Sequence, residues 1–239
     1  MPLSVQTIPT EPPHPQAVSP SVVRQRAAQT GNPFAARSLA VTVPILTTDG
    51  RQLRFEQRRA ADGIEFRFET GPLILTLRHE IYISNELSAC ARNVWAQHEQ
   101  LHVQDNNRLL PRMDGEIRNE ATLRALLITR QWLPREAFDL IQTTIREATV
   151  AIFQRLTGQA AQQRDTRAEY ARVQRQILNT CPEPFYHLVE SGDTLARLSD
   201  FYYGTSSKWR GIYDQNRGVI GANPDVVRVG LRLLIPRRP

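Results

Sequence analysis

Apolar and polar side chains alternate over residues 39–84, which is the period of a strand with one buried face. Two turn dipeptides, Asp49-Gly50 and Asp62-Gly63, interrupt this alternation. We expect the segments on either side of Asp49 to pair as a hairpin, and the remainder to supply further strands. The pattern therefore predicts a small antiparallel sheet of about four strands.

From residue 85 onward, apolar side chains recur every three or four residues, which is the period of an amphipathic helix. A long helix is expected from residue 85 to near Pro111, because proline lacks a backbone donor and clashes with the preceding turn. A second helix is expected over residues 115–131.

Two more helices complete this region. The third is expected to start after Pro134 and to end at Gly158, and its apolar side chains form a nearly continuous stripe. The fourth starts with Thr166 and Glu169, which match a capping box, and it ends at Cys181. Together with the sheet, these helices predict the α+β fold class.

The two ends of the chain differ in composition from this middle part. Residues 1–37 are rich in Pro, Ser, Thr and Gln, and we expect them to form a disordered or extended arm. Residues 38–181 are expected to form one domain, and residues 182–185 a linker. Residues 186–239 then form a second domain, which is rich in aromatic residues and glycine.

Charge and hydropathy narrow the class of protein. The 239 residues carry a net charge of +6, and every basic residue except Lys208 is an arginine. The arginines are spread along the chain without a basic run that includes aromatic residues, so we expect no nucleic-acid binding. No apolar stretch reaches the roughly 18 residues of a membrane span, and the N-terminus lacks the apolar core of a signal peptide.

Residues 186–239 predict a strand, a turn at Gly192, two helices and a closing strand. The segment contains motif residues at these positions: Val189, Gly192, Asp193, Thr194, Leu195, Tyr203, Gly204, Trp209, Ile212, Asn216, Asn223, Pro224, Gly230, Leu234, Ile235 and Pro236. In these residues and their spacing, the whole segment resembles the LysM family, whose fold is a βααβ module.

The resemblance to LysM implies binding of glycans that contain N-acetylglucosamine, usually peptidoglycan. It also assigns a shallow groove to two segments of this chain, which are Gly192, Asp193, Thr194 and Leu195 on one side and Asn223, Pro224, Asp225 and Val226 on the other. LysM-like modules also serve as assembly joints in phage baseplates and related injection machines, so both interpretations stay open.

The first long helix contains the sequence VWAQHEQLHVQDN at residues 94–106. His98 and His102 are four residues apart and therefore share one helical face. Two imidazoles at this spacing can hold a zinc ion, and Glu99 beside them can act as general base toward the water that the metal activates. The HExxH motif therefore predicts a zinc hydrolase, and the alternative is a polar helix face without a metal.

Residues 81–105 and 165–181 also resemble a group of small bacterial zinc-dependent proteases. In that group a cysteine precedes the HExxH core, and an Asp-Thr/Ser-x-x-Glu-Tyr segment runs to a second cysteine. The resemblance implies that Cys90 and Cys181 form a disulfide, whereas the cysteine count alone leaves two isolated thiols equally open.

The motif does not identify the third zinc ligand. The extended HExxH pattern with a third histidine fails, since Asp105 and Arg108 stand where it needs glycine and histidine. Asp105 is about 10 Å along the helix from His98, so it suits support of a ligand better than ligation. The remaining candidates for the third ligand are Glu116 and Glu120 on the next helix and His79 on the preceding strand. Tyr170 is a candidate oxyanion donor.

The sequence therefore predicts a zinc-dependent peptidase that a LysM domain targets to peptidoglycan, with a wall peptide or a wall-associated protein as substrate. Its location would be the cell envelope or the outside of the cell, reached by a non-classical route. The alternative is a non-enzymatic component of a phage tail, baseplate or injection particle, within a multi-protein assembly. A plain wall-binding adaptor is a third hypothesis.

Overall fold

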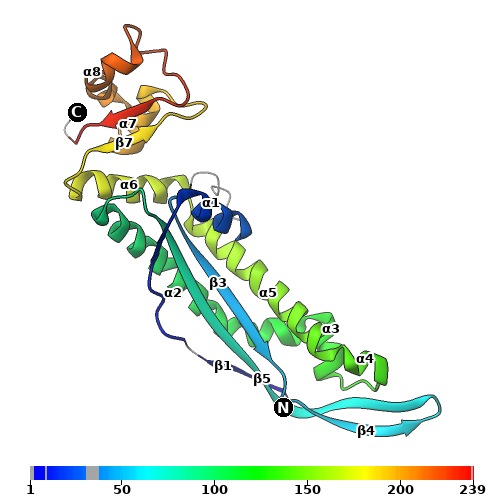
Figure 1. Ribbon diagram of the computed structural model, residues 1–239. Helices are drawn as coiled ribbons and strands as arrows, with labels where there is room; N and C mark the ends of the chain where they lie inside the picture. Colours follow the sequence, from blue (N-terminus) through cyan, green and yellow to red (C-terminus); the bar gives the residue numbers. More distant parts are fainter. Residues whose placement is uncertain (1–2, 9, 31–37, 238) are drawn as a thin grey trace. The chain divides into compact units, whose positions relative to one another are not determined.

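The computed structural model describes residues 3–8, 10–30, 38–237 and 239 (Figure 1). It contains two compact units, one formed by Met1–Ser84 and Glu99–Arg164, and the other by Asn85–His98 and Asp165–Pro239. The chain mixes helices with a small, mainly antiparallel sheet, which confirms the predicted α+β class. No helix in the described part of the chain is long and apolar enough to cross a membrane.

One long strand, β5 (Gly63–Ser84), organises the sheet of the first unit. The strand β3 (Ala40–Asp49) runs antiparallel along it. Two shorter strands, β1 (Leu3–Ile8) and β2 (Gln16–Val18), pair with β5 in parallel. The first part of β5 also pairs with β4 (Arg54–Ala60) and with the short β6 (Leu133–Pro134).

The predicted hairpin at Asp49-Gly50 is wrong, because β3 and β4 both pair with β5. The turn that follows Gly50 closes with a hydrogen bond from Leu53 N–H to the Gly50 carbonyl, 3.0 Å. This turn lies against Gly71, where a Cβ would be 2.5 Å from the Gln52 carbonyl oxygen and φ is +138°. Only glycine fits that approach, so the chain passes along β5 and does not fold back on β3.

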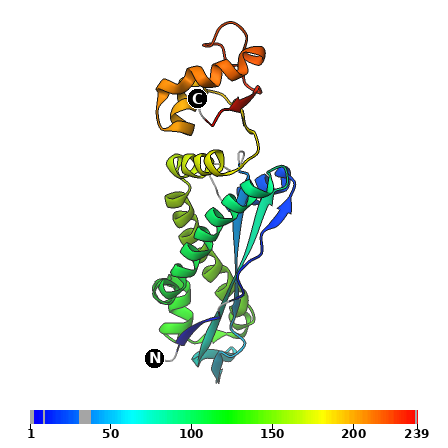
Figure 2. The same ribbon diagram turned by 90° about the vertical axis from the view of Figure 1, so that its left-hand side faces the viewer.

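The helices that follow the sheet in the first unit form a layer on one of its faces, as Figure 2 shows. The helix α2 (Ala89–Asn119) continues through Pro111, which corrects the expected end there. Leu109 is buried before the proline, and buried Met113 and Ile117 continue the apolar stripe beyond it, so this packing outweighs the lost hydrogen bond.

The rest of the predicted helical region is more broken than expected. The second helix reduces to α3 (Ala121–Leu123) and a π-helical turn (Arg124–Ile128). The third divides into α4 (Arg135–Asp139) and α5 (Ile141–Arg164). Gly158 does not end α5, since buried Leu156 and Thr157 keep that helix packed on the core.

The N-terminal arm is more ordered than predicted. Residues 3–8 and 16–18 are extended, as expected, but they are strands of the sheet, and α1 (Pro20–Gln29) is a helix. The prediction of disorder is wrong for this described part, because Val23 and Ala27 of α1 are buried in a cluster with side chains of β3 and β5. Residues 31–37 of the predicted arm lie outside the described residues.

The second unit contains the predicted βααβ order. After α6 (Arg167–Thr180), the strand β7 (Phe185–Leu188) pairs antiparallel with β8 (Arg232–Ile235). Between them lie α7 (Leu195–Tyr203), a 3-10 turn (Ser206–Lys208) and α8 (Trp209–Ile220).

Local signals explain the ends of α7. The Thr194 side chain accepts a hydrogen bond from Arg197 N–H, and Gly204 adopts the left-handed conformation with φ +73°. The core of this unit also includes Leu178 of α6, so the predicted linker at 182–185 does not separate two compact units.

Candidate functional site

The HExxH residues lie together on α2, a single helix whose residues keep their helical spacing. His98, Glu99 and His102 each offer one ligand atom, and these atoms lie within 4.8 Å of one another. His98 and Glu99 are 2% and 3% exposed, and His102 is half-buried. Burial of two adjacent ionisable side chains requires polar partners for both of them.

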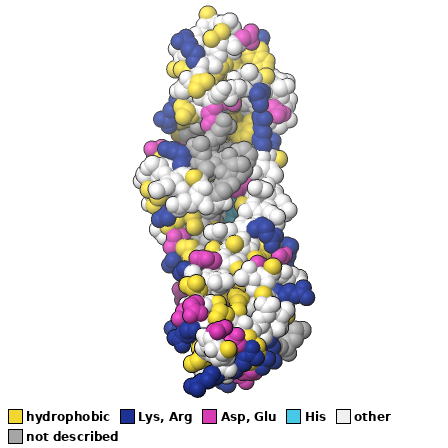
Figure 3. Space-filling view, turned by 90° about the vertical axis from the view of Figure 1, so that its right-hand side faces the viewer, with side chains coloured by type: hydrophobic (Ala, Val, Ile, Leu, Met, Phe, Trp, Pro, Cys, Tyr) yellow, Lys and Arg dark blue, Asp and Glu magenta, His cyan; other side chains and the backbone are white. Residues whose placement is uncertain are grey.

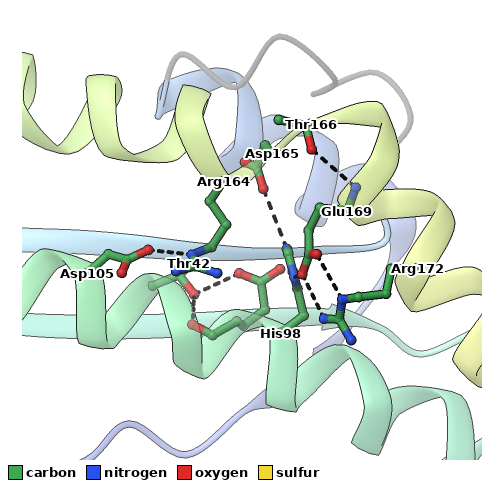
Figure 4. Close-up of polar contacts among 9 residues, drawn as sticks. Thr42, His98, Asp105, Arg164, Asp165, Thr166, Glu169 and Arg172 are labelled. Atoms are coloured by element: carbon green, nitrogen blue, oxygen red, sulfur yellow. Dashed lines mark hydrogen bonds and ion pairs between the residues drawn. The ribbon is translucent and has the colours of Figure 1, made fainter.

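Two carboxylates from the start of α6 face the His98 ring (Figure 4). An Asp165 oxygen lies 3.5 Å from Nε2, and Glu169 Oε1 lies 3.2 Å from Nδ1. Asp165 precedes the N-cap Thr166, whose side-chain oxygen accepts from the Glu169 N–H at 3.2 Å. This N-cap hydrogen bond therefore fixes the helix start that presents both acids to His98.

Glu169 is held as an anion. Arg172 donates two hydrogen bonds to its two oxygens, at 2.7 and 2.8 Å. The Arg172 guanidinium, and secondarily His98, lower the pKa of Glu169 below its ordinary value. An ionised carboxylate only accepts hydrogen bonds, so Glu169 favours a proton on Nδ1 of His98.

Glu99 meets a hydroxyl from the sheet of the first unit. Thr42, on β3, places its Oγ1 2.7 Å from Glu99 Oε2 and 3.1 Å from the Glu99 carbonyl oxygen. Both side chains are buried, so this hydrogen bond is formed away from solvent.

Two of the predicted third-ligand candidates, Glu116 and Glu120, bind other groups in the structure. Glu116 forms an ion pair with Arg155 at 2.6 Å. Glu120 caps α3 and accepts from Leu123 N–H at 2.7 Å. His79 lies buried on β5, where burial lowers its pKa to about 4 and keeps it neutral at pH 7.

Asp105 and Tyr170, the candidates for roles beside the metal ligands, also contact other side chains. Asp105 forms an ion pair with Arg164, and this pair is drawn in Figure 4. The Tyr170 ring packs against Trp95, with centroids 5.6 Å apart and edge-on geometry, and lies 6.1 Å from the His98 ring. These contacts fit a packing role for Tyr170.

Sequence reasoning missed Asp165 and Glu169 as neighbours of His98. Their signal was present in the segment DTRAEY at residues 165–170, which contains both acids. Capping of the helix is enough to explain an acid at position 169. No signal in the neighbouring sequence indicates that the Glu169 carboxylate also reaches a histidine 71 residues earlier.

A disulfide ties the two helices that carry these groups. Cys90 and Cys181 are bonded, with Cα atoms 5.5 Å apart, which is the pairing that the protease resemblance implied. Cys90 lies in the first turn of α2, and Cys181 is the C-cap of α6. The bond therefore limits how far the α2 segment with His98 and the α6 segment with Glu169 can separate.

The predicted glycan-groove residues divide into structural and exposed side chains. Asp193 accepts hydrogen bonds from Glu190 N–H and faces His187 Nε2, both at 2.8 Å, so it stabilises the turn. The Leu195 side chain is buried in the core, which leaves only its backbone for a ligand. Val226 is 47% exposed on the opposite segment, where Asn223 Oδ1 accepts from Asp225 N–H at 2.9 Å.

Surface charge shows no concentration of one sign on the face seen in Figure 3, where arginine side chains lie among acidic ones. Elsewhere in the described residues, oppositely charged side chains also form ion pairs, such as Arg58 with Glu65 at 2.6 Å and Arg118 with Asp114 at 2.9 Å.

The donor set at His98 fits zinc. Imidazole nitrogens and carboxylate oxygens, which are the donor types of His98, Glu99 and His102, are ligand types of zinc hydrolases, and a carboxylate on the outer nitrogen of a ligand histidine is a common supporting partner. In comparisons with known proteins, no family model, no curated protein and no solved structure matches the chain.

Proposed function

We propose that the chain is a zinc-dependent peptidase that a C-terminal LysM-like module holds at peptidoglycan. The observation that carries the catalytic part is the group of His98, Glu99 and His102 on α2, with the Asp165 carboxylate facing Nε2 of His98. His98 and His102 would hold the metal, and Asp165, which faces Nε2 of His98, is the candidate for the third ligand.

Asp165 suits the position of third ligand better than Glu169. Metal–ligand distances of about 2.0–2.2 Å place two ligand atoms of a tetrahedral zinc roughly 3.3–3.5 Å apart. The separation of His98 Nε2 and Asp165 Oδ1 is 3.5 Å. Glu169 instead faces Nδ1 and is bound by Arg172, so its role is to orient His98.

The remaining chemistry belongs to Glu99. When bound, zinc would act as a Lewis acid that lowers the pKa of water and polarises a peptide carbonyl. The Glu99 carboxylate accepts the proton of the attacking water and then delivers it to the leaving amine, and this transfer completes hydrolysis. The burial of Glu99 limits competing solvent and strengthens its interaction with the reacting groups.

The metal content of the purified full-length protein tests the proposal. Elemental mass spectrometry should find close to one zinc per chain after purification without chelators. Protein that contains no zinc, and takes none up from zinc-containing buffer, would contradict the enzymatic proposal and leave assembly or wall binding as the function.

The observed βααβ order supports the wall-binding part of the proposal. Two left-handed glycines support it as well: Gly192, in the turn before α7, at φ +85°, and Gly204, at the C-cap of α7, at φ +73°. The disulfide suits an oxidising compartment such as the cell envelope or the outside of the cell. Retention on the wall would raise the local concentration of wall peptides or wall-associated proteins.

A sedimentation assay with insoluble peptidoglycan checks this part with the full chain. The wild type should sediment with the wall, and Val226→Asp should lose at least about tenfold of its affinity, because a charge replaces an apolar contact in the groove. Val219→Asp is the matched control, since Val219 is similarly exposed, at 51%, at the end of α8. Equal binding by the two variants would exclude the groove as the binding surface.

A further inference from the structure

The contact between Thr42 and Glu99 joins a hydroxyl of the strand β3 to the carboxylate of the HExxH motif. On the same strand, Val41 and Val43 pack with the α1 cluster, and Thr42 alternates to the other face. The residue paired with Thr42 in the register is Ile81, which is 0% exposed. Valine would fill this buried strand position with nearly the same shape and would need no hydrogen-bond partner.

The hydrogen bond joins two buried groups from different elements. Thr42 is 7% exposed and Glu99 3% exposed, and Oγ1 lies 2.7 Å from Oε2. A hydrogen bond between a hydroxyl and a carboxylate is stronger than one between neutral groups, and burial strengthens it further. It therefore restricts rotation of the Glu99 carboxyl group about its terminal side-chain bond, which is otherwise a broad torsion.

We propose that Thr42 is a positioning residue that sets the orientation of the Glu99 carboxylate relative to His98 and His102. This inference rests on the proposed function, because the orientation matters only if Glu99 moves a proton beside a metal. The β3 strand supplies a rigid support, since it is paired with β5 over its whole length. Thr42 thus acts through Glu99 and is not itself a metal ligand.

The test uses zinc-loaded full-length protein and acetohydroxamate as the probe. Acetohydroxamate chelates zinc through two oxygens and releases a proton, for which Glu99 is the acceptor in the proposed site. Zinc affinity is measured by competition with a chromophoric chelator, and acetohydroxamate affinity by calorimetric titration. Thr42→Val removes the hydroxyl at constant shape, and Thr42→Ser keeps the hydroxyl.

Thr42→Val should retain the zinc affinity of the wild type within about threefold and should bind acetohydroxamate about tenfold more weakly, which is the effect of one hydrogen bond to a charged group. Thr42→Ser should recover most of that loss. Thr47→Val should behave as the wild type, because Thr47 is an exposed residue of the same strand.

Two results would overturn the inference while the proposed function stands. One is wild-type acetohydroxamate affinity in Thr42→Val, and the other is a Thr42→Ser variant as weak as Thr42→Val. If Thr42→Val does not fold, the result for Thr42→Ser is used instead. Loss of acetohydroxamate affinity in folded Thr42→Ser would equally exclude a role for the hydroxyl. Wild-type protein that takes up no zinc would instead overturn the proposed function and this inference together.

Discussion

We expect the double variant Cys90→Ser, Cys181→Ser to be less stable than the wild type by about 4 kcal/mol in free energy of unfolding. The disulfide joins residues 91 positions apart, and cross-linking so long a loop removes roughly 4–5 kcal/mol of chain entropy from the unfolded state. Cys181 is 2% exposed, so serine there also places a hydroxyl in an apolar site.

Urea denaturation measures this loss. Trp95 and Trp209 both lie in the second unit, so their fluorescence in a Trp132→Phe background follows unfolding of that unit alone. Wild-type protein treated with a reductant should unfold at the urea concentration of the serine variant. An unchanged midpoint in the variant would mean that the disulfide contributes nothing to the folded unit, and that packing alone holds α2 and α6 together.

The elements that the sequence predicted correctly are those whose signals are local. Thr194 and Gly204 specify the ends of α7, and Thr166 specifies the start of α6, each through contacts within a few residues. The errors concern distant partners. The pairing of β3 with β5 and the passage of α2 through Pro111 depend on packing with residues far away in sequence, which overrides the local signals for a hairpin and for a helix end.

The candidate site divides in the same way. The spacing of His98, Glu99 and His102 follows from the helix alone, so their grouping was predictable. The approach of Asp165 and Glu169 to His98 depends on how α6 packs in the second unit. Acidic residues at a helix start have a sufficient local explanation in capping and the helix dipole, which concealed their second role.

Zinc affinity should separate the roles that the geometry assigns to these residues. His98→Ala, His102→Ala and Asp165→Asn each remove a proposed ligand, and we expect each to lower zinc affinity at least about 100-fold. Glu169→Gln leaves the ligands in place but weakens the hold on His98 Nδ1, so a loss of about 10-fold is expected, at the lower end of the range for such supporting partners. The measurement is competition with a chromophoric chelator at pH 7.5.

Glu116→Gln is the matched control. Glu116 is an acidic residue of α2, the helix that carries His98 and His102, and it pairs with Arg155. Its affinity for zinc should equal that of the wild type. A larger loss from Glu169→Gln than from Asp165→Asn would transfer the third ligand to Glu169, and the Arg172 pair would then have to open for the metal to bind. Asp165 holds the ligand position only if the order of the two losses is as expected, because the two carboxylates face opposite nitrogens of one ring.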